Sequence, residues 1–120
     1  MRQPKKILVI EDNNHIREVI AGLLVDEGYD VTEVINAVEA LKLLGNRGFD
    51  LITLDLRLPG GMSGLDFLEE LTRLNGTLST IPVIVVSANA NWLKQHPQVK
   101  QVIPKPFDLI ELSEGVQQWA

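Results

Sequence analysis

Short runs of apolar, mostly β-branched residues recur along the 120-residue chain, separated by stretches with a longer period. The runs are nearly continuous rather than alternating, which is typical of strands buried on both faces of a parallel sheet. Four runs are clear, at residues 7–10, 51–54, 81–86 and 102–103, and residues 30–35 form a weaker fifth. The pattern therefore predicts five strands.

Between these runs, apolar residues recur at helical spacing. The first predicted helix ends near Gly28, and the last begins after Asp108 as its N-cap. Between Ser87 and Lys105 only residues 89–97 favour a helix, and Pro97 limits its length. The predicted apolar faces are Ile16, Val19, Ile20, Leu23 and Leu24; Ala37, Ala40, Leu41 and Leu44, before Gly45; Leu65, Phe67, Leu68, Leu71 and Leu74, before Asn75-Gly76; and Leu109, Leu112, Val116 and Trp119.

Strand and helix thus alternate five times along the chain. Parallel strands need crossover connections, and helices supply them on both faces of a sheet. We predict an α/β fold: a five-stranded, doubly wound parallel sheet with helices on both faces, in (βα)5 order, with a short or irregular fourth helix. No linker, repeat or low-complexity stretch interrupts the sequence, which predicts one domain over residues 1–120 with its core at about 5–119.

Composition narrows the class of protein. With 45% hydrophobic and 22% charged residues, the chain is ordinary for a globular domain. The absence of cysteine excludes a disulfide scaffold, thiolate catalysis and Cys-based metal sites, and fits a reducing compartment. A net charge of −5 argues against direct nucleic-acid binding, and no apolar run approaches the roughly 20 residues that span a bilayer. We expect a soluble, cytoplasmic domain that binds neither nucleic acid nor membranes.

Polar residues stand at the carboxyl ends of four predicted strands, where ligands bind in open α/β sheets. This topology predicts one pocket that holds Glu11, Asp12, Asp55, Ser87 and Lys105. Three carboxylates this close repel one another unless a cation lies among them, and oxygen ligands without His or Cys favour Mg²⁺. A carboxylate beside Mg²⁺ can attack phosphorus and form an aspartyl phosphate, while Lys105 and Ser87 cover the phosphoryl oxygens.

Four segments, in register at these strand ends, resemble the receiver (CheY-like) domain of two-component response regulators. They are KILVIEDN from Lys6, LDLRLP from Leu54, VVSA from Val85 and IPKPF from Ile103. The resemblance runs through nearly the whole chain and implies the flavodoxin-like fold predicted above. It also implies a phosphorelay function, in which the domain accepts a phosphoryl group and switches conformation for signal output. Such a domain is not an enzyme, although it assists its own phosphorylation and dephosphorylation.

The resemblance assigns the phosphoacceptor and the metal ligands. Asp55 accepts the phosphoryl group from a sensor histidine kinase or a histidine phosphotransfer protein. Glu11, Asp12, Asp55 and the main-chain carbonyl of Arg57 hold Mg²⁺, with Asp12 as the more direct ligand.

The resemblance also assigns the switch. Ser87 is the switch hydroxyl, and it binds the phosphate together with Ala88 and Lys105. The bond between Lys105 and Pro106 is cis in this family. An output domain or downstream protein binds the face formed by the fourth helix, the fifth strand and the last helix.

Three features depart from the common receiver pattern. The loop at 59–64 carries one residue more than the commonest loop, which lengthens a Gly-rich turn. Val102 stands three residues before Lys105, where many receivers carry an aromatic switch residue, and valine has no ring to turn inward behind Ser87. The span from Ser87 to Lys105 is shorter than usual by about one helical turn. We expect intact phosphorylation chemistry with a different output mechanism.

Other residues carry weaker signals. Ile16 lies at the edge of the first helix's apolar stripe, where related receivers dock the kinase's phosphotransfer domain; ordinary core packing is the alternative. His15 and His96 have no catalytic partner, and we expect both at the surface. We expect Trp92 to pack under the short fourth helix, with a partner contact as the alternative, and Asn89 to control water access to the site.

Two other functional classes use a similar fold. A haloacid-dehalogenase-like phosphatase, which hydrolyses an aspartyl phosphate, needs a second Asp where this chain has Arg57. A flavodoxin-like cofactor carrier needs a Gly- and hydroxyl-rich phosphate loop after the first strand, where Glu11 and Asp12 would repel phosphate. A receiver-like domain that acts by protein contact, with little phosphorylation-driven switching, stays open because of Val102 and the short fourth helix.

Overall fold

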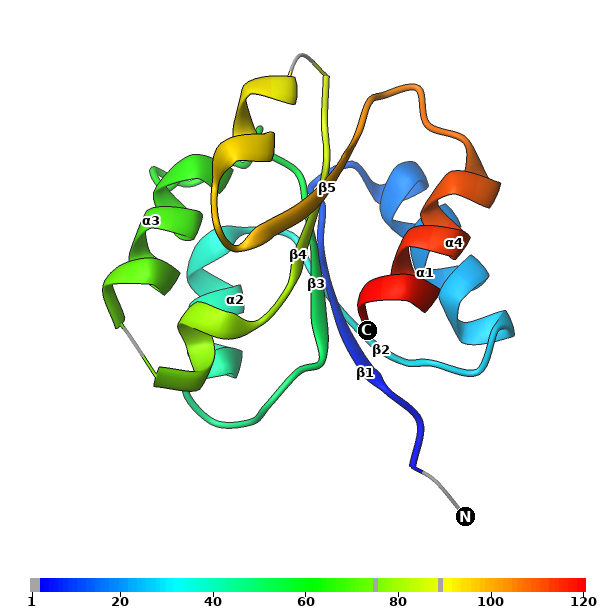
Figure 1. Cartoon of the computed structure of the whole chain (residues 1–120), viewed down its shortest axis with the longest axis horizontal. Coiled ribbons are helices and arrows are strands. Elements are labelled where there is room, and N and C mark those ends of the chain that lie inside the picture. Colours follow the sequence, from blue (N-terminus) through cyan, green and yellow to red (C-terminus); the bar gives the residue numbers. More distant parts are fainter. Residues whose placement is uncertain (1–2, 75, 89) are drawn as a thin grey trace.

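The strands form one parallel sheet in the order β2-β1-β3-β4-β5. A computed structural model describes residues 3–74, 76–88 and 90–120 (Figure 1). The strand order reverses between β1 and β3, so the two are neighbours at the switch point of a doubly wound sheet. This confirms the predicted flavodoxin-like sheet. The strands are β1 (Lys6–Ile10), β2 (Asp30–Val34), β3 (Leu51–Leu54), β4 (Val83–Val86) and β5 (Val99–Ile103).

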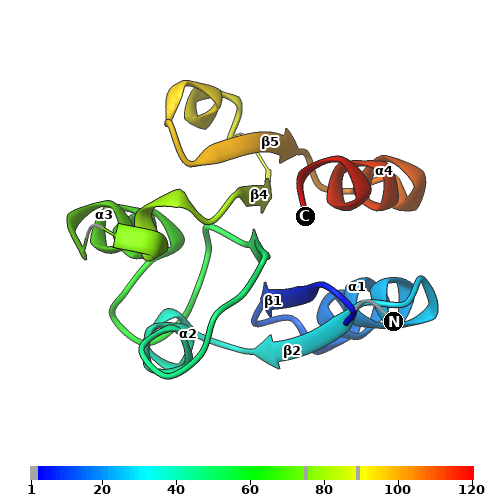
Figure 2. The same cartoon turned by 60° about the horizontal axis from the view of Figure 1, so that its bottom comes forward.

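Helices cover both faces of this sheet. Figure 2 shows α1 and α4 on one side and α2 and α3 on the other. In the part of the chain that the structure describes, no helix is long and apolar enough to cross a membrane. The α-helices are α1 (Asn14–Asp26), α2 (Ala37–Leu44), α3 (Gly64–Leu74) and α4 (Leu109–Trp119), and two short 3-10 helices are η1 (Gly76–Thr80) and η2 (Asn91–Gln95).

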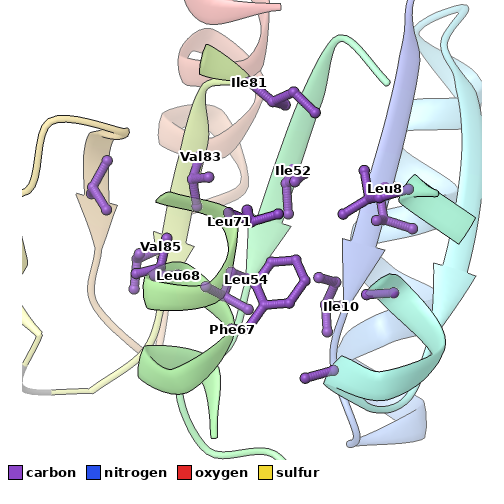
Figure 3. Close-up of a cluster of buried hydrophobic side chains, with 14 of the residues drawn as sticks. Leu8, Ile10, Ile52, Leu54, Phe67, Leu68, Leu71, Ile81, Val83 and Val85 are labelled. Atoms are coloured by element: carbon purple, nitrogen blue, oxygen red, sulfur yellow. The ribbon is translucent and has the colours of Figure 1, made fainter. Parts of the chain in front are cut away.

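The two faces of the sheet bury separate apolar clusters. Successive strand residues point to opposite faces, so Leu8 and Ile10 lie on the side of α2 and α3 while Ile7 and Val9 lie on the side of α1 and α4. Figure 3 shows the first cluster, with Phe67, Leu68 and Leu71 of α3 against side chains of β1, β3 and β4. Burial on both faces is why these strands appear in the sequence as continuous apolar runs.

The helix ends follow from specific side chains. Asp108 caps α4 as predicted, because its Oδ1 accepts a hydrogen bond from the Ile110 N–H at 2.7 Å. After α1 the chain turns at Gly28, whose φ is +95°. There the Gly28 N–H donates to the Val25 carbonyl and the Tyr29 N–H to the Leu24 carbonyl, which are the two bonds of a Schellman motif. Gly28 therefore ends α1, as predicted.

The fourth connection holds no α-helix within the described ranges. The five-residue 3-10 helix η2 fills it, so the expectation of a short fourth helix is confirmed. The expectation for Trp92 is wrong, because its side chain is 58% exposed. On this short helix only Leu93 is buried, because consecutive side chains of a 3-10 helix point about 120° apart and Trp92 therefore lies off the face that carries Leu93.

Three element ends also differ from the expectation. Strand β5 begins at Val99, three residues before the predicted run. The apolar run did not mark this start because β5 is an edge strand, on which Lys100 is exposed to solvent. Strand β4 begins only at Val83. The expectation that Leu74 and Leu109 lie on buried helix faces is wrong: both are exposed, Leu74 as the last residue of α3 and Leu109 as the first residue of α4. Asn75, predicted to help end α3, lies outside the described residues.

Candidate functional site

The pairing of β1 with β3 brings the first acidic residues together. Ile10 and Leu54 are register partners at the ends of these strands, so Glu11 and Asp55 leave the sheet side by side. The Asp55 N–H donates to the Ile10 carbonyl at 3.1 Å, which continues the ladder by one more residue. The strand ends therefore fix two carboxylates at the switch point of the sheet, where ligands bind in this class of fold.

Glu11, Asp12 and Asp55 form a carboxylate cluster. One oxygen of each lies within 4.8 Å of the others. Glu11 and Asp55 are 2% and 5% exposed, whereas Asp12 is open to solvent beside a hollow of about 500 Å³ that Arg57 also lines. The cluster thus combines two buried carboxylates with one that an incoming ligand can reach.

Lys105 bridges the two buried carboxylates. Its Nζ lies 2.6 Å from Glu11 Oε1 and 3.3 Å from Asp55 Oδ2. The Lys105–Pro106 peptide bond is cis. One ammonium therefore contacts two of the three carboxylates in the cluster, so the pocket carries more acidic than basic groups.

Hydrogen bonds also orient the Asp55 carboxylate. Its Oδ1 accepts from the Ser87 hydroxyl at 3.3 Å and from the main-chain N–H of Arg57 at 3.1 Å. Ser87 is buried and held by its own N–H, which donates to the Ile103 carbonyl, while the next residue, Ala88, is exposed. Asn89, expected to control water access, lies outside the described residues.

The environment of Glu11 disfavours its charged form. Burial raises the pKa of Glu11 to about 7, the hydrogen bond from Lys105 opposes this, and the nearby Asp55 adds to it. The pKa of Glu11 therefore lies well above that of an ordinary carboxyl group, with burial as the main cause. A set of carboxylate oxygens with excess negative charge fits a hard divalent cation such as Mg²⁺.

The loop after β3 folds back tightly on the site. A Cβ on Gly64 would lie 2.5 Å from the Asp55 carbonyl oxygen and 2.5 Å from the Leu56 Cα. Only glycine allows this approach, and the Gly64 N–H donates to the Leu56 carbonyl at 2.9 Å. The turn residues Gly60 and Gly61 have φ of +87° and +84°. This loop was expected as a lengthened Gly-rich turn.

Val102, which was expected to replace an aromatic switch residue, is a core residue. Its side chain is buried in the cluster that includes Leu93 of η2 and the β4 residues Val83 and Val85. It is paired in register with Val85, two residues before Ser87. If the Ser87 side chain moves, the neighbouring strand therefore offers the small aliphatic side chain of Val102 at this point of the sheet, and not an aromatic ring.

Ile16 lies beside the carboxylate pocket without entering it. It is half-buried and lines a hollow of about 230 Å³. His15 is exposed as expected, whereas His96 is half-buried and accepts a hydrogen bond at Nδ1 from the Gln98 N–H. The hollow is lined by His15, Ile16, Val19, Lys105, Pro106 and Phe107.

Two contacts to Glu11 were missed by the sequence analysis. The Asn13 N–H donates to Glu11 Oε2 at 3.2 Å, and Arg17 Nη1 donates to the Glu11 main-chain carbonyl at 3.1 Å. Contacts between a side chain and a nearby main-chain group leave no mark in composition or hydrophobic period. Glu11 lies outside α1, which begins at Asn14, so helical spacing did not connect it with Arg17 either.

Comparisons with known proteins agree with this geometry. The response regulator MprA of Mycobacterium sp. (strain KMS) is 33% identical over 113 residues, which cover 91% of this chain and 47% of MprA. The chain thus spans about half the length of the curated relatives it matches.

Solved structures share the fold. The receiver domain of the sensor histidine kinase PA1611 from Pseudomonas aeruginosa PAO1, with a magnesium ion in its active-site cleft, has a TM-score of 0.84 at 29% identity over 97% of both chains. The chemotaxis response regulator CheY4 of Vibrio cholerae has a TM-score of 0.85 at 24% identity, over 98% of this chain and 99% of that one. The sequence model of the response regulator receiver domain matches residues 7–117. The predicted resemblance is thereby confirmed, and the chain belongs to the family of response regulator receiver domains.

Proposed function

We propose that Asp55 accepts a phosphoryl group from a sensor histidine kinase or a histidine phosphotransfer protein. One observation carries the proposal: the buried Asp55 carboxylate lies between Lys105 Nζ and the Ser87 hydroxyl, within the cluster of three acidic residues. Such an arrangement supplies a fixed nucleophile and groups that can bind a transferred phosphoryl group.

We propose Mg²⁺ as the cofactor of this site. Glu11, Asp12 and Asp55 would hold it, together with the main-chain carbonyl of Arg57, and the exposed Asp12 offers the most accessible carboxylate. Bound Mg²⁺ supplies the positive charge that lets phosphate oxygens approach an acidic pocket. The presence of magnesium in the PA1611 receiver domain supports this assignment.

The chain's own residues then have defined tasks in the transfer. Asp55 attacks phosphorus, so an O–P bond forms while the P–N bond to the donor histidine breaks. Lys105 Nζ, already 3.3 Å from Asp55 Oδ2, binds a phosphoryl oxygen and offsets its charge. The Ser87 hydroxyl exchanges its bond to Asp55 for one to the phosphoryl group, and Ala88 provides the adjacent main chain. This movement would start the switch.

We also propose that the chain is one receiver domain over residues 1–120, with its core at 5–119, and that it signals rather than turns over a substrate. Arg57, with no acidic side chain, stands where a related phosphatase carries its general acid. The cytoplasm is the proposed location, because the histidine kinase partner draws its phosphoryl group from ATP. The proposed output surface is the face of η2, β5 and α4, to which an output domain or downstream protein would bind.

The proposed function is tested by intact-protein mass spectrometry after incubation with acetyl phosphate. We expect one phosphoryl group per chain with Mg²⁺ and none when EDTA removes the ion. Hydroxylamine should release the group, because it attacks acyl phosphates and spares phosphoserine. If the folded protein gains no mass with Mg²⁺, phosphoryl transfer is contradicted and action by protein contact becomes the better explanation.

Ile16→Asp should slow transfer from the partner kinase about tenfold or more while acetyl phosphate still reacts at the wild-type rate. A charge in the apolar hollow beside Lys105 and Phe107 would weaken a docked helix by about 1–2 kcal/mol. Ile16 lines this hollow and not the hollow beside Asp12, so the reaction with the small donor should be unaffected. The measurement is the initial phosphorylation rate with each donor.

Val25→Asp is the matched control for this test. Val25 lies near the other end of α1 and is 55% exposed, so this variant should react like the wild type with both donors. Equal slowing of both donors by Ile16→Asp would show damage to the site rather than loss of docking.

A further inference from the structure

The Arg17 side chain joins three parts of the fold beside the carboxylate cluster. Its Nη1 donates to the Glu11 main-chain carbonyl at 3.1 Å, and its Nη2 donates to Asn14 Oδ1 at 2.8 Å. Its Nε lies 3.4 Å from Glu33 Oε1 on β2. The side chain is 14% exposed, so the planar guanidinium is largely enclosed with all three of its nitrogens in use.

The carbonyl that Arg17 holds belongs to the peptide unit between Glu11 and Asp12. On the other side of this residue, the Glu11 N–H donates to the Val34 carbonyl at 3.1 Å. The main chain is thus held on both sides of Glu11, by β2 and by α1. The orientation of this peptide unit sets the direction in which Asp12 leaves the sheet. The Asp12 side chain is exposed to solvent, so core packing does not hold it in place.

We propose that Arg17 is a positioning residue for the Mg²⁺ site, because it fixes the peptide unit that aims Asp12 at the cluster. The inference rests on the proposed function, since it assigns a role toward the same cation. Arg17 does not touch the cation or the phosphoryl group. It acts through the main chain of Glu11, and its bond to Glu33 holds the guanidinium in the required plane.

If Arg17 acted on the cation through its charge alone, its removal would have the opposite effect on Mg²⁺ binding from the loss of a positioning contact. A guanidinium near an acidic pocket repels Mg²⁺, so removal of its charge should tighten Mg²⁺ binding. Loss of positioning should weaken it, because a freed Asp12 must be ordered when the ion binds. The direction of the change in Kd therefore separates the two roles.

The experiment measures the Mg²⁺ dissociation constant by isothermal titration calorimetry for Arg17→Gln and Arg17→Lys. We expect both variants to bind Mg²⁺ about 5–10-fold more weakly than the wild type. Lysine keeps the charge, but its single ammonium cannot hold three groups in one plane. Glu18→Gln is the matched control: Glu18 is an exposed residue of α1 next to Arg17 in the chain, so this variant removes one charge, leaves the Arg17 contacts in place, and should stay within about twofold of the wild type.

Phosphorylation by acetyl phosphate gives a second readout. In the Arg17 variants the Mg²⁺ concentration for half-maximal rate should rise by the same factor, and saturating Mg²⁺ should restore the wild-type rate. Urea unfolding without Mg²⁺ shows that the variants tested are folded. Unchanged or tighter Mg²⁺ binding by the two variants, beside normal binding by the wild type, overturns this inference alone. A folded wild type that binds no Mg²⁺ overturns the proposed function and this inference with it.

Discussion

Asp55→Asn should take up no phosphoryl group from acetyl phosphate under conditions that phosphorylate the wild type. The amide is neutral and is a poor nucleophile, although it has nearly the shape of the carboxylate, so the loss should exceed about 100-fold in rate. Intact mass after a fixed incubation measures it. The fold should persist, because the amide oxygen of the variant can still accept from the Ser87 hydroxyl and the Arg57 N–H, as Asp55 Oδ1 does.

Asp50→Asn is the control for this variant. Asp50 immediately precedes β3 at the other end of the strand, is exposed, and accepts from the Lys6 N–H at 2.8 Å. This change removes the same charge outside the pocket and should leave phosphorylation intact. Phosphorylation of Asp55→Asn at the wild-type rate would place the acceptor on another residue.

Mg²⁺ binding should strengthen as the pH rises to about 7 and then level off. Burial raises the pKa of Glu11 to about 7, so below that value the ion must displace a proton from the cluster. The affinity should therefore rise about tenfold per pH unit between roughly pH 5 and 7. Calorimetric titrations at several pH values measure it. Glu11→Gln should bind Mg²⁺ more weakly and with an affinity that no longer depends on pH over this range. A wild-type Mg²⁺ affinity that is constant between roughly pH 5 and 7 would contradict the assignment of Glu11 as a ligand.

Stability without Mg²⁺ should change in the opposite direction. Glu11 has a higher pKa in the folded chain, about 7, than the ordinary value of 4.5, so between these values the folded state binds more protons. The stability associated with protonated Glu11 is fully present below about pH 4.5 and is lost as the pH rises to about 7. The loss is on the order of 3 kcal/mol, and urea unfolding of the wild type and Glu11→Gln measures it.

The central strands and the site were predictable because several signals agree there. Strands β1 and β3 are buried on both faces, and their continuous apolar runs end at Glu11 and Asp55. Once the fold is a parallel sheet, topology alone brings these ends together. The resemblance to receiver domains added the individual roles, which hydrophobic period cannot supply.

The parts that sequence did not predict lie where burial is one-sided or hydrogen bonds are local. The edge strand β5 mixes buried Val99 with exposed Lys100, so its first residues resemble a loop. Trp92 is exposed because η2 has too few residues to form two buried faces. The contact from Arg17 to the Glu11 carbonyl joins a side chain to the main chain, and such contacts have no compositional signature.

The loop after β3 limits how the length of this domain can change in evolution. Gly64 lies tightly against Asp55, whereas Gly60 and Gly61 before it lie in an exposed turn. Residues can therefore be inserted in this turn at little cost, although both glycines have a positive φ that other residues adopt only with strain. A single deletion within β1 or β3 would instead shift the register and turn Glu11 or Asp55 to the opposite face of the sheet. Changes of length compatible with phosphoryl acceptance are therefore confined to the stretch between Pro59 and Gly64 on this side of the pocket, while the strands must keep their length to hold the acidic residues together.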